Sequence, residues 1–185
     1  MPVSRIIPPH AVDRPELLAR LDVGRTAPLT LVVAPAGSGK SVLLTQWAAT
    51  LGDAGVAWLD VSAPDSDAGH FARRLLAELG SLDPILADIG APLGTAGGGL
   101  GDELLEALAG ALAEVPGNIV VVFDDLHRIS NTEVVTDLWR LVDLLPSNTH
   151  FVFSSRVDLK LGWSRHRLQH GRKSGALAYA AAARQ

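Results

Sequence analysis

The amino-acid sequence predicts an α/β fold, a three-layer sandwich in which helices cover both faces of a parallel β-sheet. Short apolar runs rich in β-branched residues alternate with longer stretches whose apolar residues recur at helical spacing. The central runs are apolar at every position, which is typical of strands buried on both faces. A chain of 185 residues has room for one well-buried domain.

The first half of the chain contains two strand-helix units. The run from Leu29 to Ala34 predicts a strand because it is apolar and is followed by proline and glycine. Residues 40–51 predict a helix, since leucines and a tryptophan recur there at helical spacing. The run from Val56 to Leu59 predicts a second strand, and residues 65–80 predict a second helix with one apolar face.

The second half contains two further units, which follow a glycine-rich stretch, residues 90–101, that we expect to be a loop. Asp102 can cap a helix whose leucines form an apolar stripe. The run from Ile119 to Phe123 is the strongest strand pattern in the chain. Asn131 can cap the next helix, and the run from His150 to Ser154 predicts a fourth strand.

These patterns divide the chain into three parts. Residues 1–28 lead into the first strand, residues 29–160 form the core, and residues 161–185 form a basic and then alanine-rich tail that ends the domain incompletely. Within the tail, only the run from Ala176 to Tyr179 has the composition of a weak strand.

Composition excludes several classes of protein. The net charge of −4 and the isoelectric point near 5.8 provide no basic surface for direct binding of nucleic acid. The absence of cysteine excludes disulfides, thiolate metal sites and cysteine nucleophiles. The sequence contains neither a signal-peptide core nor an apolar run of membrane-spanning length, so we expect a soluble cytoplasmic protein, with self-association left open.

The turn after the first strand has the pattern of a phosphate-binding loop, or P-loop. Residues 34–41 read APAGSGKS, which matches the pattern except that alanine replaces the first glycine. Gly37 and Gly39 let backbone N–H groups approach phosphate oxygens. Lys40 would reach the β- and γ-phosphates, its ammonium facing ligand and solvent, and Ser41 would bind magnesium. We therefore expect ATP and Mg²⁺ as ligands, with the nucleotide held by Pro35, Ala36, Gly37, Ser38, Gly39, Lys40, Ser41 and Val42.

Two carboxylates follow the third predicted strand. Asp124 fits the magnesium-binding carboxylate of P-loop NTPases, and we expect its strand to lie beside the P-loop strand. Asp125 could orient and deprotonate the attacking water. On their own, paired aspartates would indicate an ordinary polar turn or helix cap. His127 comes soon after them and is expected to be a structural histidine at the start of a helix.

Arg156 ends the fourth predicted strand. In a parallel sheet this places its guanidinium at the same edge as Lys40 and Asp124, where it could sense the γ-phosphate. The alternative is that Arg156 only pairs with a surface carboxylate. We expect Lys40, Asp125 and Arg156 to serve catalysis, and Ser41 and Asp124 to hold the metal.

Five stretches together resemble the signal-transducing STAND-type ATPases, and within them the large LuxR-family transcriptional regulators of the maltose-activator type. The resemblance implies an ASCE or AAA-like P-loop NTPase core. The matching stretches are AVDRPELLARLD (11–22), LVVAPAGSGKSVLLTQWA (31–48), VAWLDV (56–61), VVVFDDLHRI (120–129) and HFVFSSR (150–156).

The resemblance implies roles that spacing alone does not predict. The segment around Val12, Asp13 and Arg14 would lie near the adenine and ribose, with Arg14 contacting the nucleotide. The domain would act as a switch whose ATP and ADP forms differ in the arrangement of sensor domains and a DNA-binding helix-turn-helix, all beyond this chain. The resemblance weakens after Arg156, where residues 157–171 are similar to the family's basic helix and the strand expected within 172–179 is shortened or lost.

Three functions are compatible with these motifs. The first is a regulatory ATPase that hydrolyses slowly and passes its nucleotide state to other domains. The second is a small-molecule P-loop kinase in which Arg165, Arg167, Arg172 and Lys173 cover the transferred phosphate. The third is a nucleotide-binding module without turnover. The Asp124 and Asp125 pair favours water activation, and no Asn-Lys-x-Asp motif for reading guanine is present.

Overall fold

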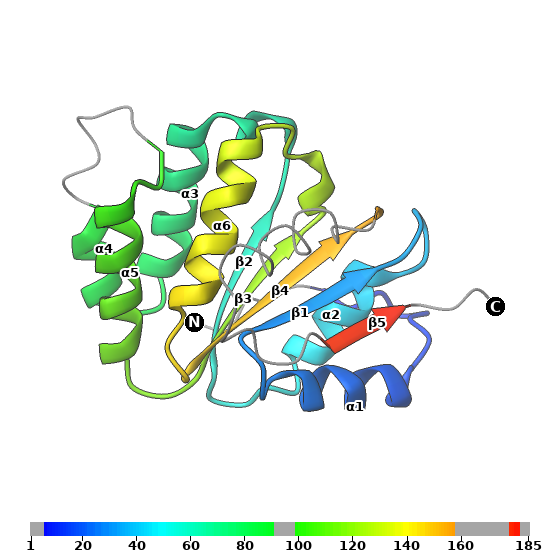
Figure 1. Cartoon of the computed structure of the whole chain (residues 1–185). Coiled ribbons are helices and arrows are strands. Elements are labelled where there is room, and N and C mark those ends of the chain that lie inside the picture. The colour runs from blue at the N-terminus through cyan, green and yellow to red at the C-terminus, as the bar shows by residue number, and fades with distance from the viewer. Residues whose placement is uncertain (1–5, 91–98, 158–177, 182–185) are drawn as a thin grey trace.

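A computed structural model describes residues 6–90, 99–157 and 178–181 of the chain (Figure 1). Its centre is a sheet of five strands in the order β2-β3-β4-β1-β5, and every neighbouring pair is parallel. The predicted α/β fold with a parallel sheet is therefore confirmed. The strands are β1 (Leu29–Val33), β2 (Gly55–Asp60), β3 (Ile119–Asp124), β4 (Thr149–Ser155) and β5 (Ala178–Ala181).

Helices form a layer on each face of this sheet (Figure 1). Helices α1 (Pro15–Gly24) and α2 (Lys40–Ala48) cover one face. The other face carries α3 (Ala68–Gly80), α5 (Asp102–Glu114) and α6 (Thr132–Leu144), with α4 (Pro84–Gly90) beside α3 and α5. Two short 3₁₀ turns, η1 (Ala63–Ser66) and η3 (Leu126–Arg128), follow β2 and β3.

The larger core lies between the sheet and the α3, α5 and α6 layer. Phe123 is its centre and contacts Phe71, Phe151 and Phe153, with ring centroids 5.2–6.3 Å apart. All four rings are fully buried, and burial of each contributes about 1.5–3 kcal/mol. The packing of these rings holds β3 and β4 in place, and polar residues follow at the carboxyl ends of both strands.

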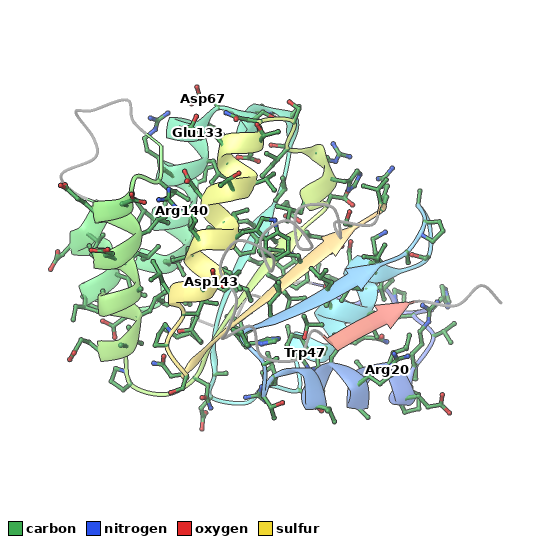
Figure 2. All side chains as sticks on the ribbon, viewed as in Figure 1. Arg20, Trp47, Asp67, Glu133, Arg140 and Asp143 are labelled. Atoms are coloured by element: carbon green, nitrogen blue, oxygen red, sulfur yellow. The ribbon has the colours of Figure 1, made fainter. Side chains whose placement is uncertain are left out.

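The smaller core lies under α1 and α2. Trp47 of α2 is fully buried there, and its indole N–H donates to the Asp22 carboxylate of α1 over 2.8 Å (Figure 2). Leu21 and Val122 belong to the same cluster. The helix that follows the P-loop is therefore held both by the sheet and by α1.

Three features differ from the sequence prediction. Helices α1 and α4 were not predicted, because they are short, with 10 and 7 residues, and their few apolar residues give weak periodicity. Strand β4 lies between β1 and β3, so the strand that ends in Asp124 is not beside the P-loop strand. Neighbour order depends on contacts distant in sequence, which local patterns do not contain.

The predicted helix caps have mixed outcomes. Asn131 caps α6 as predicted, its side chain accepting a hydrogen bond from the Glu133 N–H. Asp102 is not a cap, because Gly101 holds the cap position and Asp102 is the first helical residue of α5. The Asp102 carboxylate pairs instead with Arg140 of α6, which ties the two helices together.

Part of the predicted tail belongs to the sheet. Strand β5 falls two residues later than the weak strand expected at 176–179, and it pairs with the outer edge of β1. Most of the glycine-rich stretch and the basic residues of the tail, Arg165, Arg167, Arg172 and Lys173, lie outside the described residues. Where the structure is described, no helix is both long and apolar enough to cross a membrane.

Candidate functional site

The predicted site residues meet at the carboxyl ends of the strands. Lys40 begins α2 directly after the P-loop, Asp124 ends β3, and Arg156 follows the last residue of β4. Because all strands are parallel, these ends share one edge of the sheet. The electrostatic environment of Lys40 includes Asp124, Asp125 and Arg156, so the four charged groups form one site.

The P-loop has the backbone of an anion cradle. Gly37 and Gly39 have φ values of +74° and +79°, a region that favours glycine. Gly39 also holds the cap position of α2 without any side chain to accept hydrogen bonds there. The first N–H groups of α2 thus remain available to phosphate oxygens, with the positive end of the helix behind them.

Ala34 explains why the first glycine of the pattern is dispensable here. Its N–H donates to the Ser155 carbonyl over 3.2 Å, which extends the pairing of β1 with β4 by one residue. Its backbone is not among the positive-φ positions of the chain, and its methyl group is buried. Alanine therefore fits where the loop is still strand-like.

Lys40 differs from the sequence expectation. The ammonium does not face solvent: the residue is 6% exposed and Nζ donates to the carbonyls of Ala34 at 2.8 Å and Pro35 at 3.2 Å. Burial lowers the pKa of Lys40 below its ordinary 10.5, although the charges of Asp125 and Asp124 raise it in part. The lysine is thus folded across the loop, against the carbonyls of its first two residues.

Arg14 lies against the P-loop from outside. Its Nη1 donates to the Ser38 carbonyl over 2.9 Å, and a Cβ built on Gly39 would lie 3.6 Å from Arg14 Nη2. Beside it, Asp13 accepts a hydrogen bond of 3.4 Å from Gln46 of α2. The segment that precedes α1 therefore braces the loop and the helix after it, a contact that the sequence motif does not reveal.

Asp124 is buried beside the P-loop helix. It is 4% exposed, and Oδ1 has no hydrogen-bond partner among the described residues. A buried carboxylate oxygen without a partner is costly, which indicates a partner that arrives with the ligand. Asp124 and the Ser41 hydroxyl are the small oxygen donor set with which proteins hold magnesium alongside a substrate's phosphates, so the residues fit that ion.

Asp125 has an unusual backbone. Its φ is +61°, and no other non-glycine residue in the described ranges has a positive φ. Aspartate tolerates this left-handed conformation better than most residues do. The Asp125 side chain is 26% exposed, whereas Asp124 is buried.

Two arginines and a histidine surround the Asp125 carboxylate. Its Oδ2 lies 3.4 Å from Arg128 Nε and 3.5 Å from Arg156 Nη2, and Oδ1 lies 3.8 Å from His127 Nδ1. Burial lowers the pKa of His127 below its ordinary 6.5, against the opposing effect of Asp125. Arg128 was not singled out from the sequence, although its i,i+3 spacing from Asp125 on a short helix could have indicated the pair.

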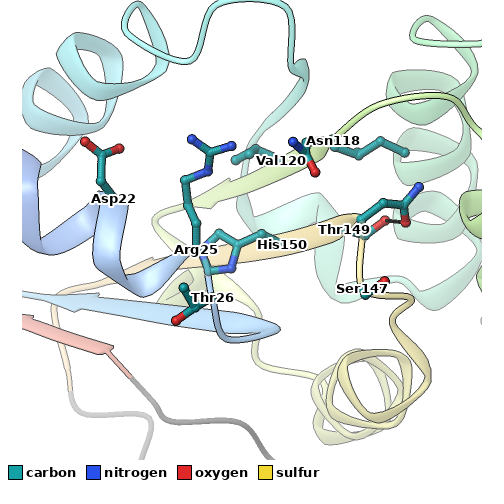
Figure 3. Close-up of a pocket in the computed structure, with 10 residues that line it drawn as sticks. Asp22, Arg25, Thr26, Asn118, Val120, Ser147, Thr149 and His150 are labelled. Carbon is teal, nitrogen blue, oxygen red and sulfur yellow. Dashed lines mark hydrogen bonds between the residues drawn. The ribbon is translucent and has the colours of Figure 1, made fainter.

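A cavity of about 170 Å³ lies far from this site, at the amino ends of the strands (Figure 3). Figure 3 shows Arg25 above His150, with Asn118 and Thr149 on the side of β3 and β4. The P-loop and Asp124 are at the opposite edge of the sheet. This cavity is therefore not the nucleotide site.

The site and fold match a known family. The model of the AAA ATPase domain family matches residues 15–154, which include the P-loop, both aspartates and most of β4. The chain belongs to the AAA ATPase domain family. As a member, this AAA domain is a nucleotide-binding P-loop module, and ATPases of this kind typically bind Mg²⁺ with the nucleotide.

Curated relatives of this AAA domain are much longer. The serine/threonine-protein kinase PknK of Mycobacterium tuberculosis is 33% identical over 164 residues, which are 87% of this chain and 14% of the relative. PknK of Mycobacterium bovis matches to the same extent. The AAA domain thus spans a small part of the relatives that it matches.

Solved structures show the same fold at low sequence identity. A Walker-type ATPase of Pyrococcus abyssi has a TM-score of 0.57 and 19% identity, covering 92% of this AAA domain and 54% of that chain. A signal transduction ATPase with numerous domains and a tetratricopeptide repeat sensor, from Pyrococcus horikoshii, has a TM-score of 0.59 and 14% identity. The match covers 96% of this AAA domain and 24% of the Pyrococcus horikoshii chain.

Proposed function

We propose that this AAA domain binds ATP with magnesium, hydrolyses it slowly and acts as the nucleotide switch of a larger signal-responsive transcriptional regulator. The observation that carries the proposal is the arrangement at one sheet edge. An uncapped helix start with Lys40 lies there together with Asp124, whose buried Oδ1 has no partner in the described structure, and with the ion pair of Asp125 and Arg156. Phosphoryl transfer needs this kind of positioning and charge stabilisation more than it needs covalent chemistry.

Each residue has a physical role in the proposal. In this proposal Lys40, whose ammonium donates to two loop carbonyls, binds the β- and γ-phosphates. Asp125, whose partly exposed carboxylate lies beside Arg156, accepts the proton of the attacking water. Arg156 is 42% exposed and exchanges Asp125 for the γ-phosphate when ATP is bound.

Magnesium would be held by Asp124 and Ser41 and would supply neutralisation of the charge on the phosphates. Arg14 completes the binding site, because the guanidinium that braces Ser38 also lies next to Gly39, the last glycine of the loop. We extend its role to the nucleotide's ribose or base, as the family resemblance implies.

The regulatory part of the proposal rests on the resemblance to the large LuxR-family regulators. Its motifs extend from Ala11 to Arg156 in the family order, and the structure brings the P-loop, Asp124 and Arg156 to one edge. Under this proposal, DNA is bound only through other domains of the regulator, and the domain works in the cytoplasm. Self-association of such domains would couple one nucleotide site to the next.

The test is phosphate release from ATP by the purified chain, with and without small phosphate acceptors, beside calorimetric titration of ATP, ADP and GTP. A regulatory ATPase prefers adenine nucleotides and releases phosphate slowly without an acceptor. ADP formation that requires an acceptor, with the phosphoryl group transferred to that acceptor and no free phosphate released, would favour the kinase function instead. Tight binding with no release in either arm would favour a nucleotide-binding module without turnover.

A further inference from the structure

Ser154 is a second buried polar residue at the nucleotide edge, and its hydroxyl has no role in the account above. The residue is fully buried near the end of β4, and Oγ has no hydrogen-bond partner within the part of the chain that the structure describes. Leaving a buried hydroxyl unpaired is destabilising. A residue of this kind in a strand of phenylalanine and valine needs a partner to explain it.

The strand register places Ser154 beside Asp124. Phe123 of β3 pairs with Phe153 of β4, so the next residues along the two parallel strands are neighbours. Parallel strands lie about 4.8 Å apart, a distance that one small bridging atom or molecule can span between two side chains. On its other side, Ser154 pairs with Val32 of β1, two residues before the P-loop begins.

The two side chains also point to the same face. Val122 and Val152 belong to the core under α2, and side chains two residues apart in a strand share a face. Asp124 and Ser154 therefore both project towards the face of the sheet that is covered by α2, the helix whose first residues are Lys40 and Ser41. Two neighbouring buried groups, the Asp124 Oδ1 and the Ser154 Oγ, are thus left without partners at the same place.

We propose that Ser154 is a positioning residue for the magnesium of bound MgATP: its hydroxyl and the Asp124 carboxylate together hold the hydrated ion. This inference rests on the proposed function. A hydroxyl can both donate to the carboxylate and accept from a metal-bound water, so one serine satisfies two partners. The adjacent carboxylate distinguishes Ser154 from Thr30, whose buried Oγ1 is equally unpaired but lies near the amino end of β1.

The experiment is calorimetric titration of ATP in magnesium and in EDTA, using wild type, Ser154→Ala and, as the matched control, Thr30→Val. In magnesium, Ser154→Ala should weaken ATP binding by about 3- to 10-fold, the loss expected for one hydrogen bond, with less than about twofold change in EDTA. Thr30→Val should leave both affinities unchanged. Thermal unfolding without nucleotide should show Ser154→Ala at least as stable as wild type, since an unpaired hydroxyl is removed.

A double-mutant cycle with Asp124→Asn completes the test. If Ser154 acts through the ion that Asp124 holds, adding Ser154→Ala to Asp124→Asn should cause no further loss of affinity in magnesium. Equal affinities of wild type and Ser154→Ala in magnesium would overturn the inference, as would an equal loss in magnesium and EDTA. A wild type that binds ATP no better in magnesium than in EDTA would instead contradict the proposed function, and the inference with it.

Discussion

At the residue scale, the left-handed backbone of Asp125 decides which substitution can test its carboxylate. Asparagine keeps the shape of the side chain and tolerates a φ of +61°, whereas alanine there would add about 1–2 kcal/mol of backbone strain. Asp125→Asn should therefore retain ATP binding and slow hydrolysis by about 10²-fold, as expected for loss of a general base. Phosphate release under saturating ATP measures it.

The corresponding Asp125→Ala variant serves as a check on strain. It should lose hydrolysis equally and also unfold at a lower denaturant concentration than Asp125→Asn. Hydrolysis by Asp125→Asn at the wild-type rate would remove the catalytic role of this carboxylate, because no proton acceptor would remain at position 125.

Arg156 should distinguish ATP from ADP. Its guanidinium shares Asp125 Oδ2 with Arg128, and it lies at the end of the strand next to the one that carries Asp124. A charge-assisted hydrogen bond contributes about 1.5–3 kcal/mol, so Arg156→Ala should weaken ATP binding by at least about tenfold and leave ADP binding nearly unchanged. Calorimetric titration of both nucleotides measures the difference.

Arg128→Ala is the matched control for that experiment. Arg128 pairs with the same carboxylate oxygen and is similarly exposed, at 48% against 42%. If Arg156 contacts the third phosphate, only its removal should be selective for ATP. Equal losses for ATP and ADP in Arg156→Ala would mean that this arginine has a structural role.

At the scale of elements, His150 ties the start of β4 to the turn before β1. Its Nδ1–H donates to the Ala27 carbonyl over 2.6 Å, and its ring meets the Trp47 ring in a T-shaped arrangement with centroids 6.3 Å apart. Burial lowers the pKa of His150 from 6.5 to about 4, while the bond to Ala27 opposes the shift. The folded protein thus keeps this imidazole neutral.

The consequence is a pH-dependent stability. The pKa is lower in the folded than in the unfolded state, so the contribution is fully present above pH 6.5 and is lost as the pH falls towards 4. The shift corresponds to about 3 kcal/mol, and His150→Gln should flatten the fall of unfolding free energy across this window by a similar amount. Urea unfolding at a series of pH values measures it.

The exposed His10 provides the control for this prediction. His10→Gln should follow the wild-type pH dependence throughout. If His150→Gln and wild type lost stability in parallel between pH 6.5 and 4, acid sensitivity would come from the carboxylates and not from β4.

At the scale of the whole molecule, local patterns predicted the elements but not their neighbours. The apolar runs gave β1 to β4 within one or two residues, because burial on both faces leaves a clear mark in the sequence. The placement of β4 between β1 and β3 depends on pairing between segments more than 100 residues apart, as in Leu29 with Phe151. The short helices α1 and α4 contain too few apolar residues at helical spacing to be predicted from the sequence.

For the candidate site too, features set by local sequence could be predicted and features set by tertiary contacts could not. The glycines, Lys40 and the two aspartates were recognisable because their chemistry depends on spacing along the chain. The inward fold of Lys40, the brace from Arg14 and the cations around Asp125 depend on tertiary contacts. So does the position of Ser154 next to Asp124, since a serine within an apolar strand has no sequence signature of its own.

The central claim is that the P-loop binds ATP through Lys40, and one measurement tests it most directly. Calorimetric titration with ATP and magnesium compares wild type, Lys40→Ala and the control Arg73→Ala, which removes an exposed charge on α3. Because charge-assisted bonds to phosphate are lost, Lys40→Ala should bind at least about tenfold more weakly, with an unchanged circular dichroism spectrum. Arg73→Ala should bind like wild type. Wild-type ATP affinity in Lys40→Ala would contradict the account.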